Sequence, residues 1–178
     1  ELSAVARLFA EHQSILSGPF LDLGCGNGGV FKIMFKHRPD AYGIDSEATR
    51  LGDIDEARNS RAYIEVRRES GDKLSFPKAF FGLVFSNSVL EHVPQTLPLL
   101  REVYRVLKPN GHFVFTTPHP RLYSQVSYYW RKVLSLLGLD VIGRLIAQRE
   151  CTVYHHVSIF SSDMWQSQLE TVGFSLSQ

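Results

Sequence analysis

The sequence has 178 residues, which is the length of one compact domain and too short for two full ones. Apolar residues make up 44% of it and charged residues 21%, a composition that excludes a disordered or a collagen-like chain. The 19 Lys and Arg residues against 18 Asp and Glu residues leave a net charge of +1, which gives no support for binding a nucleic acid through its phosphates. We therefore expect a single domain over residues 1–178 and no nucleic-acid partner.

The sequence carries no sign of export or of a membrane span. Its two cysteines, Cys25 and Cys151, are too few for a disulfide framework. Neither a signal peptide nor an apolar run of about 18 residues is present, and we therefore expect a cytoplasmic protein. The sequence starts at Glu1 instead of Met and reaches Gln178 just after a predicted strand begins, so we expect it to be trimmed.

Helical and strand periodicities alternate in the first part of the chain, which is the pattern of βα units around a parallel sheet. The predicted elements are a helix over 2–15, a strand over 20–23, a helix ending at Pro39, a strand over 41–44 leading to Asp45, a helix over 49–60 and a strand over 62–66. The helix before Pro39 should bury one stripe of side chains, made of Val30, Ile33, Met34 and His37.

The alternation continues with a strand over 80–85, a helix and a strand over 112–116. This helix should bury Leu97, Leu100, Val103, Tyr104 and Leu107, and it should end at Pro109 and Gly111. The predicted fold class is therefore α/β: a Rossmann-like three-layer sandwich with a mostly parallel sheet and helices on both faces.

The alternation stops over residues 118–160, a stretch far longer than the usual connection of about 4–6 residues. Between Pro118 and Arg149 it holds five basic residues and one acid, Asp140, together with many large apolar side chains. A segment inserted after the fifth strand leaves the sheet at the edge where ligands of open α/β sheets bind, so we expect a cap over the site. A helical pair that only widens the core, a homodimer contact, and a peripheral membrane contact through 121–149 are the alternatives.

After this insertion the alternation resumes with a helix. Ser161 or Ser162 is the expected N-cap, Trp165, Leu169 and Val172 form the apolar face, and Gly173 ends the helix. A sixth strand is expected over 174–177.

The segment FLDLGCGNGG, residues 20–29, is the most informative part of the sequence. Its glycines come where a buried strand must turn sharply, and the helix that follows offers free backbone N–H groups to a ligand. Gly24, Gly26 and Gly29 fit the G-x-G-x-x-G dinucleotide fingerprint, and Asp45 follows 21 residues after Gly24, as a ribose-binding acid should. The motif alone does not separate a dinucleotide from another adenosine ligand. For the glycine loop the alternative is a tight turn without a ligand, and for Asp45 it is an exposed acid at a strand end.

Four ordered blocks carry a resemblance to a known family. They are LDLGCGNGG, YGIDSE, GDKLSFPKAFFGLVFSNSVLEHVPQ and LREVYRVLKPNGHFVFTTP. Together they resemble the class I methyltransferases that use S-adenosylmethionine, in particular the small-molecule branch called type 11. The family's seventh, antiparallel strand has no counterpart before Gln178.

The resemblance implies roles for individual positions. Asp22, Gly24, Cys25 and Gly26 would frame the methionine end of S-adenosylmethionine, and Ser86 and Asn87 would lie near its amine. Asp45 would hold the ribose, and Asp72 with the backbone of Lys73 would read the amino edge of the adenine. Ser46 and Leu74 would lie on either side of the adenine ring.

Methyl transfer is an in-line displacement, so alignment in a desolvated site supplies much of the catalysis. A general base helps if the acceptor is a hydroxyl or an acidic C–H, and the neutral-pH candidates are His92, His119, His155 and His156. Each of these histidines has a structural role as its alternative. We expect His92 and His119 to be catalytic, and Tyr123, Trp130, His155 and His156 to contact the acceptor.

No His, Cys or acid spacing resembles a metal site, and we expect no metal. The Asn/Asp-Pro-Pro-aromatic signature of DNA adenine methyltransferases is absent, since Ser86-Asn87-Ser88-Val89 stands in its place. The sequence thus predicts a methyltransferase that acts on a small organic or lipid-linked acceptor and releases S-adenosylhomocysteine. An NAD(P)-dependent oxidoreductase and a non-catalytic S-adenosylmethionine-binding module are the alternatives.

Overall fold

The structure is a computed structural model, and it describes residues 2–35, 38, 40–46, 51–118, 158 and 160–175. The chain divides into two compact units. The first comprises Glu1–Val89 and Leu97–Thr116, and the second comprises Leu90–Thr96 and Thr117–Gln178. The first unit contains the whole described sheet, and most of the predicted insertion at 118–160 lies outside the described residues.

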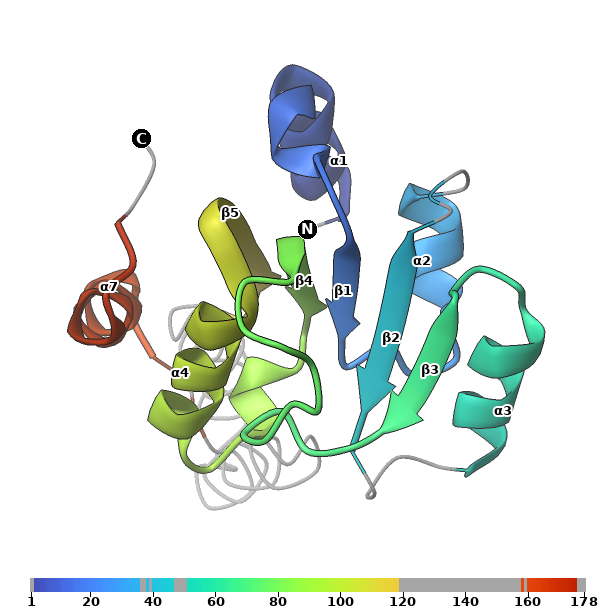
Figure 1. Ribbon diagram of the computed structural model, residues 1–178. Helices are drawn as coiled ribbons and strands as arrows, with labels where there is room; N and C mark the ends of the chain where they lie inside the picture. The colour runs from blue at the N-terminus through green and yellow to red at the C-terminus, as the bar shows by residue number, and fades with distance from the viewer. Residues whose placement is uncertain are drawn as a thin grey trace, which may run out of the picture. The chain divides into compact units, whose positions relative to one another are not determined.

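The first unit is built on five parallel strands, shown in Figure 1. They are β1 (Phe20–Leu23), β2 (Ala41–Asp45), β3 (Glu65–Arg68), β4 (Phe81–Asn87) and β5 (Leu107–Thr116). Their order in the sheet is β3-β2-β1-β4-β5, and every neighbouring pair is parallel. This arrangement confirms the predicted α/β class. It also brings all carboxyl ends of the strands to one edge, with β1 in the middle.

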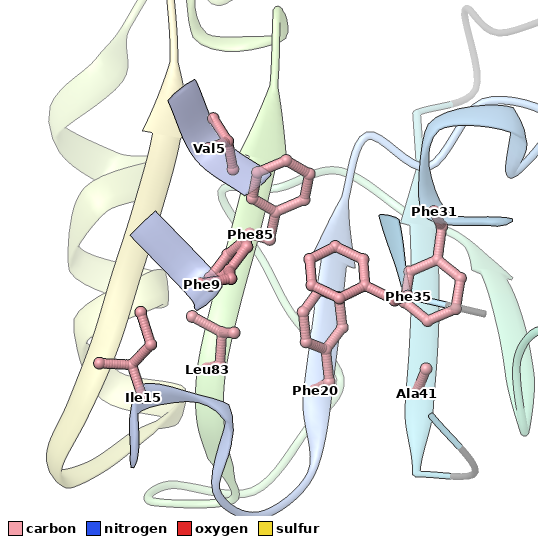
Figure 2. Packing of buried hydrophobic residues seen from close by; sticks show 9 residues of the cluster. All are labelled: Val5, Phe9, Ile15, Phe20, Phe31, Phe35, Ala41, Leu83 and Phe85. Atoms are coloured by element: carbon pink, nitrogen blue, oxygen red, sulfur yellow. The ribbon is translucent and has the colours of Figure 1, made fainter. Parts of the chain in front are cut away.

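One face of the sheet is covered by α1 (Leu2–Glu11), the 3₁₀ turn η1 (Gln13–Leu16) and α2 (Gly29–Met34). The core beneath them is rich in phenylalanine, as Figure 2 shows. The ring centroids of Phe20 and Phe35 lie 4.8 Å apart, and those of Phe9 and Phe35 lie 5.1 Å apart. Tilted and edge-on ring pairs of this kind stabilise a core beyond the area that they bury. The cluster consists of Val5, Phe9, Ile15, Phe20, Phe31, Phe35, Ala41, Leu83 and Phe85.

Two further helices complete the layers of the first unit. Helix α3 (Leu51–Asn59) buries Ile54 and Ala57 against Cys25 and Val66. Helix α4 (Thr96–Val106) buries Leu99, Leu100, Val103 and Val106. The tip of Leu99 comes close to that of Leu23 around Gly71. Because alternate residues of a strand face opposite sides, Leu23 points away from the face that holds Phe20 and Asp22, so α4 covers the second face of the sheet.

The helix predictions need two corrections on buried faces. Ile33 is 69% exposed, because α2 turns Phe31 and then Phe35 toward the sheet instead of the stripe that the sequence suggested. Tyr104 is 48% exposed, since four other side chains of α4 already fill its apolar face. The predicted helix over 2–15 is divided into α1 and η1, and His37 and Pro39 lie outside the described residues.

The strand predictions are corrected at β3 and β5. Strand β3 begins at Glu65 because Ala62 and Tyr63 still belong to the connection after α3. Strand β5 begins at Leu107, five residues before the predicted start. Its pairing with β4 jumps from Phe81↔Leu107 to Leu83↔His112, so the residues around Pro109, where the helix was predicted to end, form a bulge inside the strand. Proline is tolerated there because β5 is the outer strand of the described sheet.

The second unit holds η2 (Leu90–His92) and α7 (Ser162–Val172). Both predicted ends of α7 are confirmed: the Ser161 side chain accepts a hydrogen bond from the Met164 N–H, and Gly173 adopts a left-handed conformation at φ 110°. The Ser158 hydroxyl donates to the Val93 carbonyl at 2.6 Å. Phe174 and Ser175 form no strand, and the rest of the predicted sixth strand lies outside the described residues.

Candidate functional site

The candidate site begins where β1 ends, at the middle of the carboxyl edge. The N–H groups of Gly24 and Cys25 both donate to the Ile44 carbonyl, at 2.8 and 2.9 Å. This double contact bends the chain sharply after β1 and ties the bend to the end of β2. The chain then enters α2 through Gly28, whose N–H donates to the Cys25 carbonyl at 2.8 Å. The glycine loop is therefore fixed to its own sheet by backbone hydrogen bonds.

Two glycines of this loop are required for different reasons. Gly24 has a φ of 81°, and a Cβ at this position would lie 2.2 Å from the Val89 Cγ2 atom. Gly26 has a φ of 49°, yet a Cβ there would meet no atom within 4 Å. Gly24 is thus needed by the packing of the protein itself. Gly26 instead leaves its backbone open to close approach by a ligand.

Asp45 joins the end of β2 to the glycine loop. Its Oδ2 atom accepts a 2.6 Å hydrogen bond from the Gly26 N–H, and its Oδ1 atom accepts a 2.7 Å bond from the Ser46 N–H. Two backbone donors therefore orient one carboxylate at the strand end. An oriented carboxylate of this kind is what recognition of two neighbouring hydroxyl groups requires.

Asp22 is a buried carboxyl group inside the same edge of the sheet, and its side chain is 5% exposed. The Tyr63 hydroxyl donates to its Oδ2 atom at 2.6 Å. Burial raises the pKa of Asp22 from 3.8 to about 7; the Tyr63 hydrogen bond opposes this shift, and the charge of Asp45 adds to it. Burial also raises the pKa of Tyr63, so its hydroxyl stays protonated and remains a donor. Asp22 consequently titrates close to neutral pH.

Cys25 contributes to the loop through its backbone, because its side chain points into the protein. The thiol packs beside Gly43, where a Cβ would lie 3.0 Å from the Sγ atom, and it belongs to the cluster with Ile54 and Val66. Burial raises the pKa of this thiol, which therefore stays neutral and unreactive.

The remaining predicted cofactor residues stand around the same edge. Ser46 is exposed directly after Asp45. Asp72 and Lys73 are exposed on the loop after β3, where the Lys73 N–H donates to the Ser70 carbonyl at 3.2 Å. Asn87 ends β4, and its Oδ1 atom accepts a 2.9 Å hydrogen bond from the Thr116 hydroxyl. One sheet edge thus carries all these residues, on the loops that follow β1, β2 and β3 and at the end of β4.

Residues 21–115 match the family described as methyltransferase domain, which is more than half of the chain. The match spans the glycine loop, Asp45, the loop after β3 and the strands that carry them. The chain belongs to the class I S-adenosylmethionine-dependent methyltransferases.

Relatives of this methyltransferase chain are themselves named as methyltransferases. It is 28% identical to the ubiquinone biosynthesis O-methyltransferase of Methylococcus capsulatus over 76% of this chain and 55% of the relative. It is 32% identical to the ubiquinone/menaquinone biosynthesis C-methyltransferase of Desulfotalea psychrophila over 75% of this chain and 54% of the relative. An S-adenosylmethionine-dependent methyltransferase structure from Mesorhizobium loti is 31% identical, with a TM-score of 0.52 over 67% of this chain and 56% of the other. The chain thus spans about half the length of the curated relatives that it matches.

The residues present fit the cofactor of this methyltransferase family. An open glycine backbone at Gly26 and an oriented carboxylate at Asp45 stand next to each other, joined by a direct hydrogen bond. Within the described ranges, no three His, Cys, Asp or Glu side chains gather as metal ligands would. In the same part of the chain, no helix meets the length and apolarity needed to span a bilayer.

The predicted acceptor-side residues of the methyltransferase are described only at His92. It is exposed at the end of η2 in the second unit, five residues after Asn87. The other predictions of this kind lie outside the described residues: His119, Tyr123, Trp130, His155 and His156. Tyr63 was not among the predicted site residues, since a single tyrosine ahead of a strand gives no signal that it reaches an acid 41 residues earlier.

Proposed function

We propose that this chain transfers a methyl group from S-adenosylmethionine to a small organic or lipid-linked acceptor. The observation that carries the proposal is the hydrogen bond between Gly26 and Asp45, which unites a ligand-accessible backbone with an oriented carboxylate in a member of this family. Asp45 would bind the ribose hydroxyls, and Asp72 would accept a hydrogen bond from the adenine amino group. Gly24 and Gly26 would let the methionine end approach, with Asp22 behind the loop and Asn87 near the amine.

The bound cofactor supplies a methyl group on a positively charged sulfur, and its transfer leaves S-adenosylhomocysteine. The protein's own share of the reaction is to bind, to orient and to exclude water. An acceptor hydroxyl or acidic C–H must lose its proton as the new bond forms, and we assign that proton to His92, with His119 as the second candidate. The pairing of either histidine with the acceptor is a part of the proposal.

The acceptor is proposed as a quinone-related ring, because the two curated relatives described above are named for quinone biosynthesis, one for O-methylation and the other for C-methylation. Tyr123, Trp130, His155 and His156 are proposed to contact it from the insertion. The excess of basic residues between 118 and 149 supports a peripheral membrane contact there, where a lipid-linked acceptor would be met. We also propose that the insertion forms a homodimer contact. The location that we propose for the protein is the cytoplasm.

Two alternatives differ from this proposal, one in its cofactor and the other in its lack of turnover. An NAD(P)-dependent oxidoreductase would share the glycine loop and Asp45, and a non-catalytic module would keep the cofactor site without turnover. Membership in the methyltransferase family favours the proposed reaction over the oxidoreductase.

Calorimetric titration of the chain with S-adenosylhomocysteine, beside NAD and NADP in the same buffer, tests the proposal. We expect micromolar binding of S-adenosylhomocysteine and no heat from either nicotinamide. Preference for a nicotinamide, or the binding of no ligand by a folded sample, would overturn the proposal. Methyl transfer from labelled cofactor to a catechol or hydroquinone then separates the enzyme from the non-catalytic module.

A further inference from the structure

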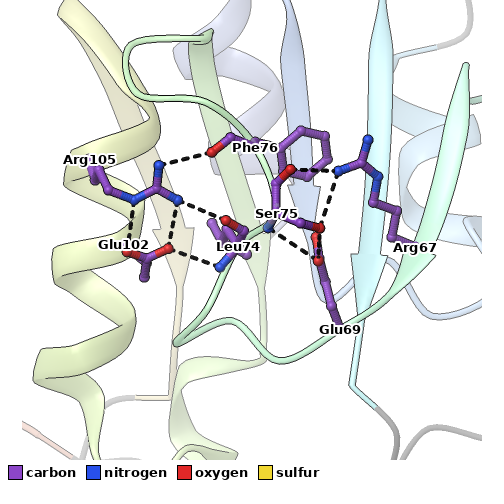
Figure 3. Close-up of polar contacts among 7 residues, drawn as sticks. All are labelled: Arg67, Glu69, Leu74, Ser75, Phe76, Glu102 and Arg105. Carbon is purple, nitrogen blue, oxygen red and sulfur yellow. Dashed lines mark hydrogen bonds and ion pairs between the residues drawn. The ribbon is translucent and has the colours of Figure 1, made fainter.

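The backbone of the loop after β3 is held by side chains on two sides, as Figure 3 shows. The held residues are Leu74, Ser75 and Phe76. Their three carbonyl groups each accept a hydrogen bond from an arginine, and the N–H groups of Leu74 and Ser75 each donate to a glutamate. A loop whose backbone is satisfied by side chains from other elements has one conformation that those elements determine.

We call the side chains that hold this backbone the clamp. Its first side comes from α4. Arg105 donates to the Leu74 carbonyl at 2.8 Å through Nη2 and to the Phe76 carbonyl at 2.9 Å through Nη1. Glu102 accepts from the Leu74 N–H at 2.9 Å and binds Arg105 through both of its carboxylate oxygens, at 2.7 and 2.8 Å. The arginine holds the pKa of Glu102 below its usual range. Both side chains are therefore charged and mutually fixed at neutral pH.

The second side comes from β3 and its continuation. Arg67 donates to the Ser75 carbonyl at 3.0 Å, and its guanidinium lies 4.1 Å from the centre of the Phe76 ring. Glu69 accepts from the Ser75 N–H at 3.2 Å and from the Ser75 hydroxyl. Four charged side chains from two elements thus act on three consecutive residues.

The clamped residues follow, in the same loop, the segment that leaves β3 beside the candidate cofactor site. The Glu69 N–H donates to the Asp45 carbonyl at 2.9 Å, so the chain leaves β3 next to the proposed ribose ligand. Gly71 is packed so closely that a Cβ would lie 2.9 Å from the Leu99 Cδ1 atom and 3.3 Å from the Leu23 Cδ1 atom. Asp72 therefore lies in the chain between a tightly packed glycine before it and the clamped backbone after it.

We propose that Arg105, Glu102, Arg67 and Glu69 are positioning residues that hold the loop so that Asp72 meets the amino edge of the adenine. They touch no ligand themselves, and they determine ligand selectivity through Asp72. The inference rests on the proposed function. It predicts that weakening the clamp removes discrimination at the adenine edge, whereas a purely structural clamp would affect every ligand alike.

The test uses the full chain, S-adenosylhomocysteine and its inosine analogue, in which an oxo group replaces the amino group. Arg105→Lys keeps the charge but cannot bridge two carbonyls in a fixed fork. We expect a loss of about tenfold in affinity for S-adenosylhomocysteine, and a fall of about tenfold in its preference over the analogue. Arg101→Lys is the matched control on α4, since Arg101 is exposed. It should change neither value.

A thermodynamic cycle with Asp72→Ala completes the test. That variant should lose the same preference, and adding Arg105→Lys to it should cost no further preference, because the two changes act on one contact. If Arg105→Lys does not fold, Glu69→Gln on the opposite side must show the loss. Equal weakening for both ligands, or a native chain that binds both equally, overturns the inference and leaves the proposed function standing. A native chain that binds neither overturns both.

Discussion

The Tyr63 hydroxyl donates a 2.6 Å hydrogen bond to the Asp22 carboxyl group, across 41 residues of sequence. This bond connects the middle strand of the sheet to the segment that enters its outer strand β3. The acid that accepts this bond is buried, and its pKa is raised to about 7. The pH of the solution therefore acts on the interior of the candidate site and not only on its surface.

Stability should fall as the pH rises toward neutrality. The folded protein keeps the Asp22 proton up to about pH 7, whereas the unfolded chain releases it near 3.8, so the folded state binds more protons between these values. The free energy of unfolding should consequently decrease between about pH 4 and pH 7, by up to about 4 kcal/mol, and then level off. Urea denaturation of the native chain and of Asp22→Asn measures this. The variant should gain on the native chain over that interval, and a constant difference would contradict the prediction.

Removing the Tyr63 hydroxyl should be costly mainly above neutral pH. Tyr63→Phe retains the ring, which packs 4.6 Å from that of Phe31, and takes away only the donor to Asp22. The pKa of Asp22 should rise further, because this hydrogen bond lowers it. We expect a loss of about 1–3 kcal/mol at pH 8, where the buried carboxylate lacks its donor, and a smaller one at pH 5. The same loss at both values would show that the hydroxyl does not act through the charge of Asp22.

Alanine should have opposite effects at two glycines. Gly24→Ala forces a left-handed backbone on alanine and a collision with Val89, and we expect a loss of about 2–4 kcal/mol. Gly52→Ala lies in α3 with no atom within 4 Å of the added methyl group, and it should gain about 0.4–1 kcal/mol. Thermal unfolding of both variants checks the pair. Adding Val89→Ala to Gly24→Ala should restore part of the loss, and no restoration would locate the whole cost in the backbone.

Asp45→Ala should weaken binding of S-adenosylhomocysteine by about 1–3 kcal/mol, since it removes charge-assisted hydrogen bonds. The change also takes away the acceptor that orients the Gly26 N–H. Asp55→Ala, an exposed acid on α3, is the control. Calorimetry gives the affinity of each variant, and circular dichroism verifies that each is folded. An unchanged affinity of Asp45→Ala would remove this residue from the site.

His92→Ala should keep the affinity for S-adenosylhomocysteine and lose turnover, by about 10²–10⁴ in rate if the histidine is the general base. The measurement is transfer of a labelled methyl group to a catechol, beside His12→Ala, which removes an exposed histidine far from the sheet edge in sequence. Loss of the fold would assign His92 a structural role instead. Equal turnover in the two variants would exclude it as the base.

The sequence was sufficient for the elements whose signals are local. Strand β1 was predicted with its true bounds, because a short apolar run stands between a Gly-Pro turn and a glycine loop. The ends of α7 followed from a serine and a glycine at the two caps. The predicted α/β class likewise required only the alternation of two periods.

Other features depended on partners that are distant in sequence. Ile33 reads as a core residue by spacing, and only the position of α2 over the sheet decides that Phe31 and Phe35 are buried in its place. The bulge around Pro109 is a property of the pairing between β4 and β5. Tyr63 and Arg105 gave no signal, because an isolated tyrosine or arginine acquires its role only when folding brings its acceptor near.

Selection should retain Gly24 and Gly26 for different reasons and to different degrees. A lineage that gave up its cofactor would still be selected to keep Gly24, since the native packing around Val89 demands it. No such demand acts on the space beside Gly26, where asparagine, which tolerates a φ near 49°, could become fixed by drift. Related proteins that have lost catalysis should thus carry their first substitution at position 26, while the rest of the loop still has the sequence of an active enzyme.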